Sequence, residues 1–262
     1  MHVGLVGYGV VGRALGRFLS RSPSLRVSIF DKFLPGHASP RDLISVDRAD
    51  VVFVSVPTPY DQAAGACDIS AVEESIGALS APACIKSTIP PGTTDALIKQ
   101  TGKHIAFSPE YVGESFGHPW PEVDDCGFAV FGGDEIACSL ARQVYEHVAR
   151  PSFRYFMTTA ITAELGKYME NAFLASKVAF VNQFYDLAAR TGIEFEELRQ
   201  MFLLDARVGE SHTRVSRERG FGGKCLPKDL QTIAAWARQS GTPAALLEAI
   251  LAYNEAARSV RA

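Results

Sequence analysis

Cys225 lies in a local pattern that could activate its thiol. Two adjacent glycines, Gly222 and Gly223, precede it, and Pro227 and Asp229 follow it. Proline is favoured in the first turn of a helix, so the pattern predicts a helix that begins at Pro227. The thiol would then lie just ahead of the helix N-terminus, where the helix dipole stabilises a nucleophilic thiolate, and Asp229 would lie one turn further on. The segment therefore predicts a catalytic cysteine, whereas a cysteine without such neighbours is usually buried and inert.

Lys167 and Asn171 form a second candidate pair on a long stretch that contains no proline. From about Thr158 to Arg190 the apolar residues keep a helical spacing, which predicts one helix of roughly 50 Å. Because such a helix is too long for one small domain, it predicts a connector between domains, a subunit interface, or both. Lys167 and Asn171 are four residues apart and share one face of it. In isolation such a pair is more often a solvated lysine beside an exposed asparagine.

The N-terminus carries three glycines at the spacing of a dinucleotide-binding turn. Gly7, Gly9 and Gly12 stand between a short apolar run and a segment with helical spacing. Gly7 would permit the tight turn, Gly9 would let the backbone approach a pyrophosphate, and Gly12 would let the helix pack on the strand. The helix start at Val10 and Val11 would offer free N–H groups and the positive end of its dipole to the phosphates.

Asp31 stands where a carboxylate would bind the ribose of the dinucleotide. It ends a second predicted strand, Leu25 to Phe30, about 20 residues after the glycine turn. A carboxylate there accepts hydrogen bonds from ribose hydroxyls and repels a 2′-phosphate, which favours NAD over NADP. Lys32 beside it weakens that preference a little. Glycines alone could merely form a turn, but their place between strand and helix, with Asp31 following, favours a cofactor site.

Strand and helix signals continue to alternate through the first half of the chain. Ser70 and Glu73 form a predicted capping box at the start of a helix. The other predicted elements are strands at residues 50–56, 83–87, 104–107 and 128–131 and a helix at 134–147. This order predicts a doubly wound parallel sheet, the α/β Rossmann class, in which ligands bind beyond the carboxyl ends of the strands. The segments that follow three of those ends, Val56-Pro57-Thr58, Ser87-Thr88 and Ser108-Pro109-Glu110, are therefore expected to line the cleft, although proline also simply terminates strands.

The composition excludes several classes of protein. The 262 residues are 47% hydrophobic and 21% charged, with a net charge of −3, which argues against a non-specific nucleic-acid binder. No run approaches the roughly 20 apolar residues of a membrane helix, and the first residues lack the pattern of a signal peptide. The five cysteines are far apart and form no Cys-x-x-Cys pair, so neither a disulfide framework nor a metal site is expected. These features predict a cytoplasmic globular protein.

Seven segments, in order along the chain, resemble the UDP-glucose/GDP-mannose dehydrogenase family. They are the glycine turn Gly7–Gly12, Val56–Pro59, Ser87–Thr93, Ser108–Glu114, Glu164–Lys167 with Asn171–Ala175, Asp205–Gly209 and Phe221–Asp229. The last of these is highly specific. The resemblance implies residues 1–157 as an NAD-binding Rossmann domain and residues 158–262 as an all-helical domain with a long connecting and dimerisation helix.

The resemblance implies an NAD-dependent, four-electron oxidation of a primary alcohol to a carboxylate. UDP-glucose, giving UDP-glucuronate, is the first candidate substrate. Hydride transfer would give an aldehyde, Cys225 would add to it as a thiohemiacetal, and a second hydride transfer would give a thioester that water hydrolyses. Lys167 and Asn171 would stabilise the charge on oxygen, and Asp229 would move protons with an ordered water that Thr88 helps to place.

The resemblance also assigns binding residues, and it implies a homodimer in which Arg207 reaches the neighbouring site. Glu110 and Glu114 occupy the positions of carboxylates implicated in thioester hydrolysis and sugar contacts. The expected NAD contacts are Gly7, Gly9, Val10, Val11, Gly12, Asp31, Lys32, Val56, Pro57, Thr58, Thr88 and Glu114. The expected substrate contacts are Glu110, Tyr111, Val112, Lys167, Asn171, Arg207, Phe221, Gly222, Gly223 and Cys225.

Two departures from the family pattern affect substrate binding. Family members usually continue with a third domain that grips the nucleotide, whereas this sequence stops at Ala262, as either a truncated piece or a natural minimal form. The segment 115–126 also lacks the usual family residues and carries Pro119, Trp120 and Pro121 instead. The substrate contacts of that loop are therefore open.

Two other functions fit parts of the sequence. A β-hydroxyacid dehydrogenase of the 6-phosphogluconate dehydrogenase type shares the Rossmann-plus-helix plan and a Lys-x-x-x-Asn pair, but it performs one two-electron oxidation and needs no cysteine. A non-catalytic relic could bind NAD and turn nothing over. The intact set of Lys167, Asn171, Cys225 and Asp229 favours the four-electron enzyme.

Overall fold

A computed structural model describes residues 1–113 and 120–259, and it divides the chain into two compact units. The first unit comprises Met1–Pro59 and Cys67–Lys167, and the second comprises Tyr60–Ala66 and Tyr168–Ala262. The sequence-based boundary after residue 157 precedes the long helix, whereas the division between the units falls within it.

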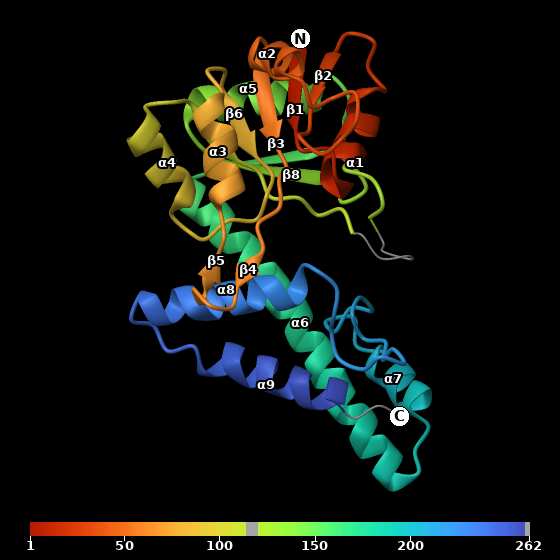
Figure 1. The fold of residues 1–262 in the computed structure, drawn as a ribbon. Coiled ribbons are helices and arrows are strands. Elements are labelled where there is room, and N and C mark those ends of the chain that lie inside the picture. The colour runs from red at the N-terminus through yellow and green to blue at the C-terminus, as the bar shows by residue number, and fades with distance from the viewer. Residues whose placement is uncertain (114–119, 260–262) are drawn as a thin grey trace. The chain divides into compact units, whose positions relative to one another are not determined.

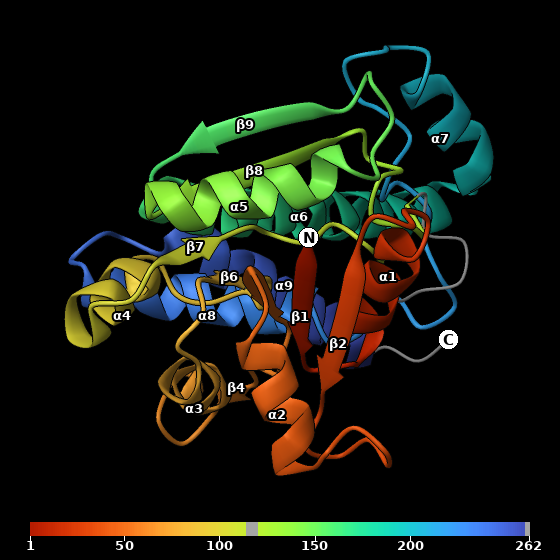
Figure 2. The same cartoon turned by 90° about the horizontal axis from the view of Figure 1, so that it is seen from above.

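The first unit contains a seven-stranded sheet with helices on both faces (Figures 1 and 2). Its strands are β1 (His2–Val6), β2 (Arg26–Phe30), β3 (Val51–Val54), β6 (Ala83–Ile85), β7 (Ile105–Phe107), β8 (Phe128–Gly133) and β9 (Arg154–Thr158). Its helices are α1 (Val10–Leu19), α2 (Pro40–Asp47), α3 (Ser70–Ala78), α4 (Thr93–Thr101) and α5 (Glu135–Glu146). The predicted α/β class with a Rossmann-type sheet is confirmed.

The sheet order is β2-β1-β3-β6-β7-β8-β9, and its strand pairs are parallel apart from β7 with β8. The expectation of a wholly parallel sheet is therefore wrong at this pair. Parallel neighbours need a crossover, usually a helix, whereas antiparallel ones do not. The described residues between β7 and β8 contain no helix, which is consistent with the reversal.

Each face of the sheet is covered by the helices whose apolar side chains point toward it. Helix α1 buries Ala14, Leu15, Phe18 and Leu19, which recur at helical spacing. These side chains and those of α5 form one core against β1 and β3. Helices α2, α3 and α4 contribute to a second core, on the opposite face of these strands. With both faces buried, the central strands are continuous apolar runs, as β3 shows over Val51–Val54.

The capping box predicted at Ser70 and Glu73 is wrong. Helix α3 begins at Ser70 itself, with Ile69 at its N-cap, and the Ser70 amide donates to Asp68 Oδ1 over 2.9 Å. Asp68 thus supplies the side-chain oxygen two residues earlier than expected. A complete capping box occurs instead at Ser39 and Asp42, ahead of α2, which the sequence reading did not predict.

The second unit contains α7 (Phe195–Phe202), α8 (Leu226–Gln239), α9 (Ala245–Ser259) and most of a short hairpin, β4 (Tyr60–Asp61) with β5 (Ala66–Cys67). It also contains most of α6 (Ala160–Thr191), the single long helix that the sequence predicts. Helices α6, α8 and α9 share one apolar core. It includes Tyr168 and Val178 of α6, Leu230 and Ile233 of α8, and Ile250 of α9. This core fixes α8, and therefore the residue at its N-cap, against α6 and α9.

Glu164, in the second turn of α6, binds the N-terminus of α4 within the first unit. Its Oε1 accepts from the Thr94 amide over 2.8 Å and from the Thr94 hydroxyl over 2.6 Å, and its Oε2 accepts from the Gly92 amide over 2.6 Å. The side chain is fully buried. Burial raises the pKa of Glu164, and the hydrogen bonds from Thr94 and Gly92 oppose that rise only in part.

We expect Glu164→Gln to reduce the dependence of stability on pH. A raised pKa means that the folded protein binds the proton more tightly than the unfolded chain. The contribution of Glu164 to the free energy of unfolding therefore falls as the pH rises above 4.5, the ordinary pKa of this carboxyl. The glutamine variant lacks this titration, and its amide would face the Gly92 donor. Urea unfolding between about pH 4 and pH 7 should show the variant less stable at acid pH, with a difference that narrows as pH rises. A constant difference would contradict this account.

Candidate active site

The glycine turn between β1 and α1 has the geometry of a phosphate cradle. Gly7 has φ +83°, and a side chain there would collide with the Ser55 carbonyl. A side chain at Gly12 would collide with the Gly7 carbonyl, so close packing requires both glycines. Among the described residues, none comes within 4 Å of the position that a Cβ would take at Gly9. The turn therefore leaves room for a pyrophosphate beside Gly9 and the N-terminus of α1.

Asp31 is fixed beside this turn by two backbone amides. Its Oδ2 accepts from the Tyr8 amide over 2.7 Å, and its Oδ1 accepts from the Phe33 amide over 2.8 Å. Each carboxylate oxygen has two lone pairs, so both can still accept from ribose hydroxyls. Lys32 next to it pairs with Glu74 of α3 over 2.8 Å. This exposed pair holds the ammonium that could otherwise attract a 2′-phosphate, which agrees with the expected preference for NAD.

The segments that follow β1, β3 and β6 are tied together at one edge of the sheet. Ser55 Oγ donates to the Gly7 carbonyl over 2.9 Å, and Ser87 Oγ donates to the Val56 carbonyl over 2.7 Å. Thr58 Oγ1 donates to the Thr88 carbonyl over 2.9 Å. The segments after β3 and β6 thus lie against each other and next to the glycine turn, as predicted from the carboxyl ends of these strands.

Glu110 does not extend into solvent but turns toward a buried lysine. Its Oε2 lies 3.3 Å from Lys86 Nζ, and its Oε1 accepts from the Tyr111 and Val112 amides over 2.8 and 3.1 Å. Lys86 Nζ also donates to the hydroxyls of Ser108 and Tyr145, each over 3.1 Å. Burial opposes the charge on Lys86, but the Glu110 carboxylate and the Tyr145 hydroxyl raise its pKa overall. The sequence assigned no role to Lys86 or Tyr145, and it placed Glu110 among carboxylates for thioester hydrolysis and sugar contacts, without the ion pair that the structure shows.

An aromatic cluster covers the start of the loop after β7. Tyr111 packs at 4.8 Å from Phe128 and at 6.5 Å from Trp120, measured between ring centroids. Lys167 Nζ lies 4.5 Å from the centroid of the Tyr111 ring, a cation–π distance. Trp120, which departs from the family pattern, thus belongs to the packing around Tyr111. Glu114, an expected NAD and catalytic residue, lies outside the described residues.

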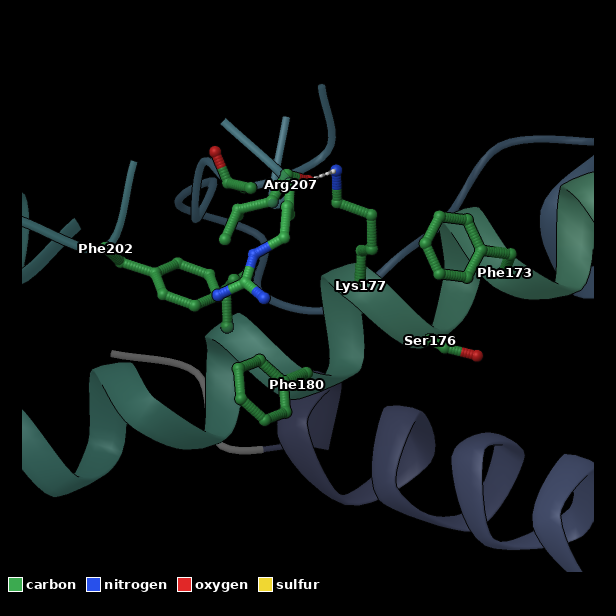
Figure 3. Close-up of a pocket in the computed structure, with 9 residues that line it drawn as sticks. Phe173, Ser176, Lys177, Phe180, Phe202 and Arg207 are labelled. Atoms are coloured by element: carbon green, nitrogen blue, oxygen red, sulfur yellow. Dashed lines mark hydrogen bonds between the residues drawn. The ribbon is translucent and has the colours of Figure 1, made fainter. Parts of the chain in front are cut away.

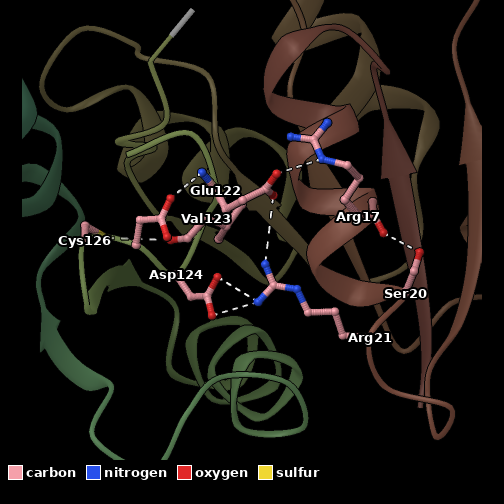
Figure 4. A network of polar contacts seen from close by, with 9 residues as sticks. Arg17, Ser20, Arg21, Glu122, Val123, Asp124 and Cys126 are labelled. Carbon is pink, nitrogen blue, oxygen red and sulfur yellow. Dashed lines mark hydrogen bonds and ion pairs between the residues drawn. The ribbon is translucent and has the colours of Figure 1, made fainter. Parts of the chain in front are cut away.

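The end of the same loop is bound to α1 by ion pairs (Figure 4). Arg17 Nε lies 3.0 Å from Glu122 Oε1, and Arg21 lies 2.9 Å from Asp124. Both arginines are half exposed, so each pair contributes little stability by itself. Together they fix the segment 122–124 beside the helix that carries the glycine turn.

In the second unit, Asn171, Cys225 and Asp229 come together at the start of α8. Cys225 is the exposed N-cap residue, as predicted, with Pro227 in the first turn of the helix. The Asp229 amide donates to the Cys225 carbonyl over 2.9 Å, and Asn171 Nδ2 donates to Asp229 Oδ2. Asp229 is buried, and its other oxygen pairs with Lys228 Nζ. The sequence analysis did not include Lys228, although it directly precedes Asp229.

Arg207 lies at a cavity of about 320 Å³ beside α6 (Figure 3). The walls of this cavity include Phe173, Phe180 and Phe202. Arg207 is 90% exposed at its side chain, and its guanidinium binds the Asp205 carboxylate through Nε over 2.9 Å. Lys177 Nζ donates to the carbonyls of Val208 and Gly209, which fixes the loop after α7 to α6. Arg207 is therefore an exposed side chain on a loop that is anchored to α6.

None of the helices in residues 1–113 and 120–259 is both long and apolar enough to cross a membrane. The same residues contain no group of three or more histidine, cysteine, aspartate or glutamate side chains that could hold a metal ion.

Two family models match the chain. The NAD binding domain of the UDP-glucose/GDP-mannose dehydrogenase family matches residues 40–149, and the central domain of that family matches residues 161–256. Among curated relatives, a UDP-glucose 6-dehydrogenase of Pseudomonas aeruginosa is 33% identical over 227 residues, which cover 79% of this chain and 48% of the relative. A UDP-glucose 6-dehydrogenase of Rhizobium meliloti is 30% identical over 225 residues, 80% of this chain and 51% of the relative. The chain thus spans about half the length of these relatives.

Solved structures show the same fold. A UDP-glucose dehydrogenase from Pyrobaculum islandicum aligns with a TM-score of 0.80 at 28% identity, over 97% of this chain and 68% of that one. A 3-hydroxyisobutyrate dehydrogenase from Mycobacterium tuberculosis aligns with a TM-score of 0.73 at 19% identity, over 100% of this chain and 94% of that one. The second likeness is evidence for the fold alone.

Proposed function

Because the chain belongs to the UDP-glucose/GDP-mannose dehydrogenase family, we propose that it is an NAD-dependent nucleotide-sugar 6-dehydrogenase. The reaction would oxidise a primary alcohol to a carboxylate, with UDP-glucose as the first candidate. The observation that carries this proposal is the cluster at the start of α8. There an exposed thiol at a helix N-cap lies one turn before a buried carboxylate that Asn171 orients.

The glycine turn and Asp31 would hold NAD, which would supply the hydride acceptor for two successive oxidations, one molecule for each. The first transfer releases the alcohol proton and leaves an aldehyde. The Cys225 sulfur then forms a C–S bond to the aldehyde carbon, and the carbonyl oxygen gains a proton. The second transfer oxidises this thiohemiacetal to a thioester and releases that proton. Water then breaks the C–S bond, which yields the carboxylate and restores the thiol.

The chain's own residues would stabilise charge and move protons in these steps. Lys167 and Asn171, four residues apart on α6, are suited to stabilise the negative charge that develops on the substrate oxygen. Asp229 would take up and return protons through a water molecule. Thr88 follows β6 at the same sheet edge as the glycine turn, where it could help to hold that water or the nicotinamide. Glu114 is proposed to act in thioester hydrolysis.

Counting NADH against substrate tests the proposed reaction. A panel of nucleotide sugars, including UDP-glucose, GDP-mannose and UDP-N-acetylhexosamines, would be incubated with NAD. Two NADH per sugar support the four-electron enzyme. One NADH per molecule of a 3-hydroxyacid substrate would favour the β-hydroxyacid dehydrogenase, whose fold-level counterpart is the 3-hydroxyisobutyrate dehydrogenase. Measurable NAD binding without NADH from any sugar would favour a non-catalytic relic.

A homodimer is the second part of the proposal, and exposed apolar side chains support it. On α6 Met169 is 76% exposed and Phe173 is 62% exposed, and Leu204 beyond α7 is 85% exposed. Phe180 packs against Phe202 at 6.0 Å and is itself half exposed. Apolar groups that cluster on a surface mark interfaces, and a second copy of the chain is a suitable partner for one long helix. Arg207 borders this surface and would reach the partner's substrate.

If Arg207 acts in the partner's site, two inactive variants should complement each other. Arg207→Ala and Cys225→Ala would each lose most of their NADH formation. After the two are mixed and allowed to exchange subunits, a heterodimer contains one site with both substitutions and one with neither, so part of the activity should return. Glu218→Ala, which removes an exposed charge outside the proposed site, is the control that should stay active alone. No recovery in a sample shown to contain heterodimers would exclude the shared site.

A further inference from the structure

The loop before Cys225 is gripped by a buried asparagine of α9. Asn254 Oδ1 accepts from the Phe221 amide over 2.7 Å, and Asn254 Nδ2 donates to the Phe221 carbonyl over 3.0 Å. One side-chain amide therefore pairs with both backbone groups of Phe221, as a neighbouring strand would. Asn254 is 7% exposed and Phe221 is 3% exposed, so both hydrogen bonds lie out of water. Buried bonds of this kind are costly to lose because the remaining partner stays unsatisfied.

A second asparagine and an arginine hold the two residues before Phe221. Asn182 of α6 is fully buried, and its Oδ1 accepts from the Gly220 amide and from Arg219 Nε, each over 3.0 Å. Arg258 of α9 donates to the Arg219 carbonyl over 3.2 Å. Residues 219–221 are thus bound from two helices of the same unit.

The contact with α9 also explains why residue 220 is glycine. Gly220 has φ +54°, and a side chain there would collide with Asn254 Oδ1. The absence of a side chain at Gly220 therefore lets α9 approach the loop closely enough for Asn254 to hold it.

Only a short tether separates Phe221, which Asn254 holds, from the thiol of Cys225. The tether consists of Gly222, Gly223 and Lys224, and its last two residues are exposed. Cys225 is fixed on its other side because it is the N-cap of α8. A tether that contains two glycines is pliable, so the backbone at Cys225 keeps one conformation only if both ends are anchored.

We propose that Asn254 is a positioning residue that holds Phe221 so that the tether presents the Cys225 thiol to the N-terminus of α8. The inference rests on the proposed function in taking Cys225 as the nucleophile. Asn254 itself is not expected to touch the substrate. Its effect is exerted through the orientation of Cys225, and it should appear in the reactivity of that thiol even without substrate.

Alkylation of Cys225 measures this effect directly. The full chain would be treated with iodoacetamide across a pH series, and modification of the Cys225 peptide would be followed by mass spectrometry. In the wild type the rate should reach half its maximum well below about pH 8.5, the midpoint of an unperturbed thiol. In Asn254→Ala the midpoint should move up toward that value, with a roughly tenfold slower reaction near neutral pH for each unit moved. Identical profiles for both proteins would overturn the proposal.

Ile250→Ala is the matched control for a general loss of stability. Ile250 is one turn earlier on α9 and is buried in the core that α6, α8 and α9 share. Its truncation should lower the unfolding temperature as Asn254→Ala does, yet leave the Cys225 profile unchanged. If both variants shift the profile equally, loosening of the unit accounts for the effect and the proposal is wrong.

Gly220→Ala approaches the same contact from the loop and serves if Asn254→Ala does not fold. Its new methyl group would push against Asn254 Oδ1, so it should shift the Cys225 profile in the wild-type background. In the Asn254→Ala background the same change should add less, because the side chain that it strikes is gone. Equal, additive shifts in the two backgrounds would contradict a role for this contact.

The alkylation assay requires neither sugar nor NAD, so it separates the inference from the proposed function. A shifted profile in Asn254→Ala beside a wild type that forms no NADH would support the positioning role and refute the proposed reaction. Normal NADH formation by the wild type, with an unshifted alkylation profile in Asn254→Ala, would support the proposed reaction and refute the positioning role.

Discussion

Cys225→Ala is expected to lower steady-state NADH formation by about a thousandfold or more, because removal of a covalent nucleophile affects every later step of the reaction. Without the sulfur the aldehyde cannot become a thiohemiacetal, so the second hydride transfer has no substrate on the enzyme. The variant should therefore form at most one NADH per bound sugar. Rapid-mixing measurements of NADH absorbance would count this first turnover.

Cys126→Ala is the control for this substitution. Cys126 is partly buried in the first unit, and its thiol donates to the Phe128 carbonyl over 3.1 Å. Burial raises the pKa of its thiol, so it is a poor nucleophile. The control should keep two NADH per sugar. If Cys225→Ala also released two NADH per sugar at an undiminished rate, the thioester route would be excluded.

The features that could be predicted from the sequence are those that neighbouring residues determine. The N-cap position of Cys225 follows from Gly222, Gly223 and Pro227, all within three residues of it. The glycine turn follows in the same way from Gly7 and Gly12. The length of α6 was also predictable, because no proline interrupts its helical spacing.

The features that were missed depend on segments that are distant in the sequence. Lys86 follows β6, Glu110 follows β7 and Tyr145 belongs to α5, so their meeting requires the finished sheet. Asn254 similarly meets Phe221 only after α9 has packed on α6. A polar residue on a helix looks solvated until the partner it faces is known.

The reversed strand β8 and the grip on the Cys225 loop have a common physical origin. The sequence correctly predicted a strand in the first case and a glycine-containing loop in the second. The direction of the strand and the contacts of the loop, however, depend on neighbours that are distant in the sequence. Gly220 illustrates the point. The sequence assigned no role to this residue, whereas its amide binds Asn182 and its missing Cβ makes room for Asn254. Glycine here allows a tight, ordered contact.

Lys86→Met is expected to destabilise the first unit by about 3–5 kcal/mol, the usual cost of breaking a buried ion pair. Lys86 and Glu110 are 2% and 7% exposed at their side chains, so the loss leaves the Glu110 carboxylate buried beside an apolar group. Burial also raises the pKa of Tyr145, so its hydroxyl stays neutral and cannot substitute for the lost ammonium.

Urea unfolding of three further variants would attribute that loss to the uncompensated charge. Lys32→Met removes an ammonium from an exposed pair with Glu74, so it should cost no more than about 1 kcal/mol. Glu110→Gln removes the other partner and should leave Lys86 unpaired. The double variant Lys86→Met/Glu110→Gln buries no charge and should recover much of the stability that Lys86→Met loses. The contrary result would be a double variant that loses as much unfolding free energy as the two single variants together. In that case the packing around Lys86, and not its charge, would hold Glu110 and the loop after β7.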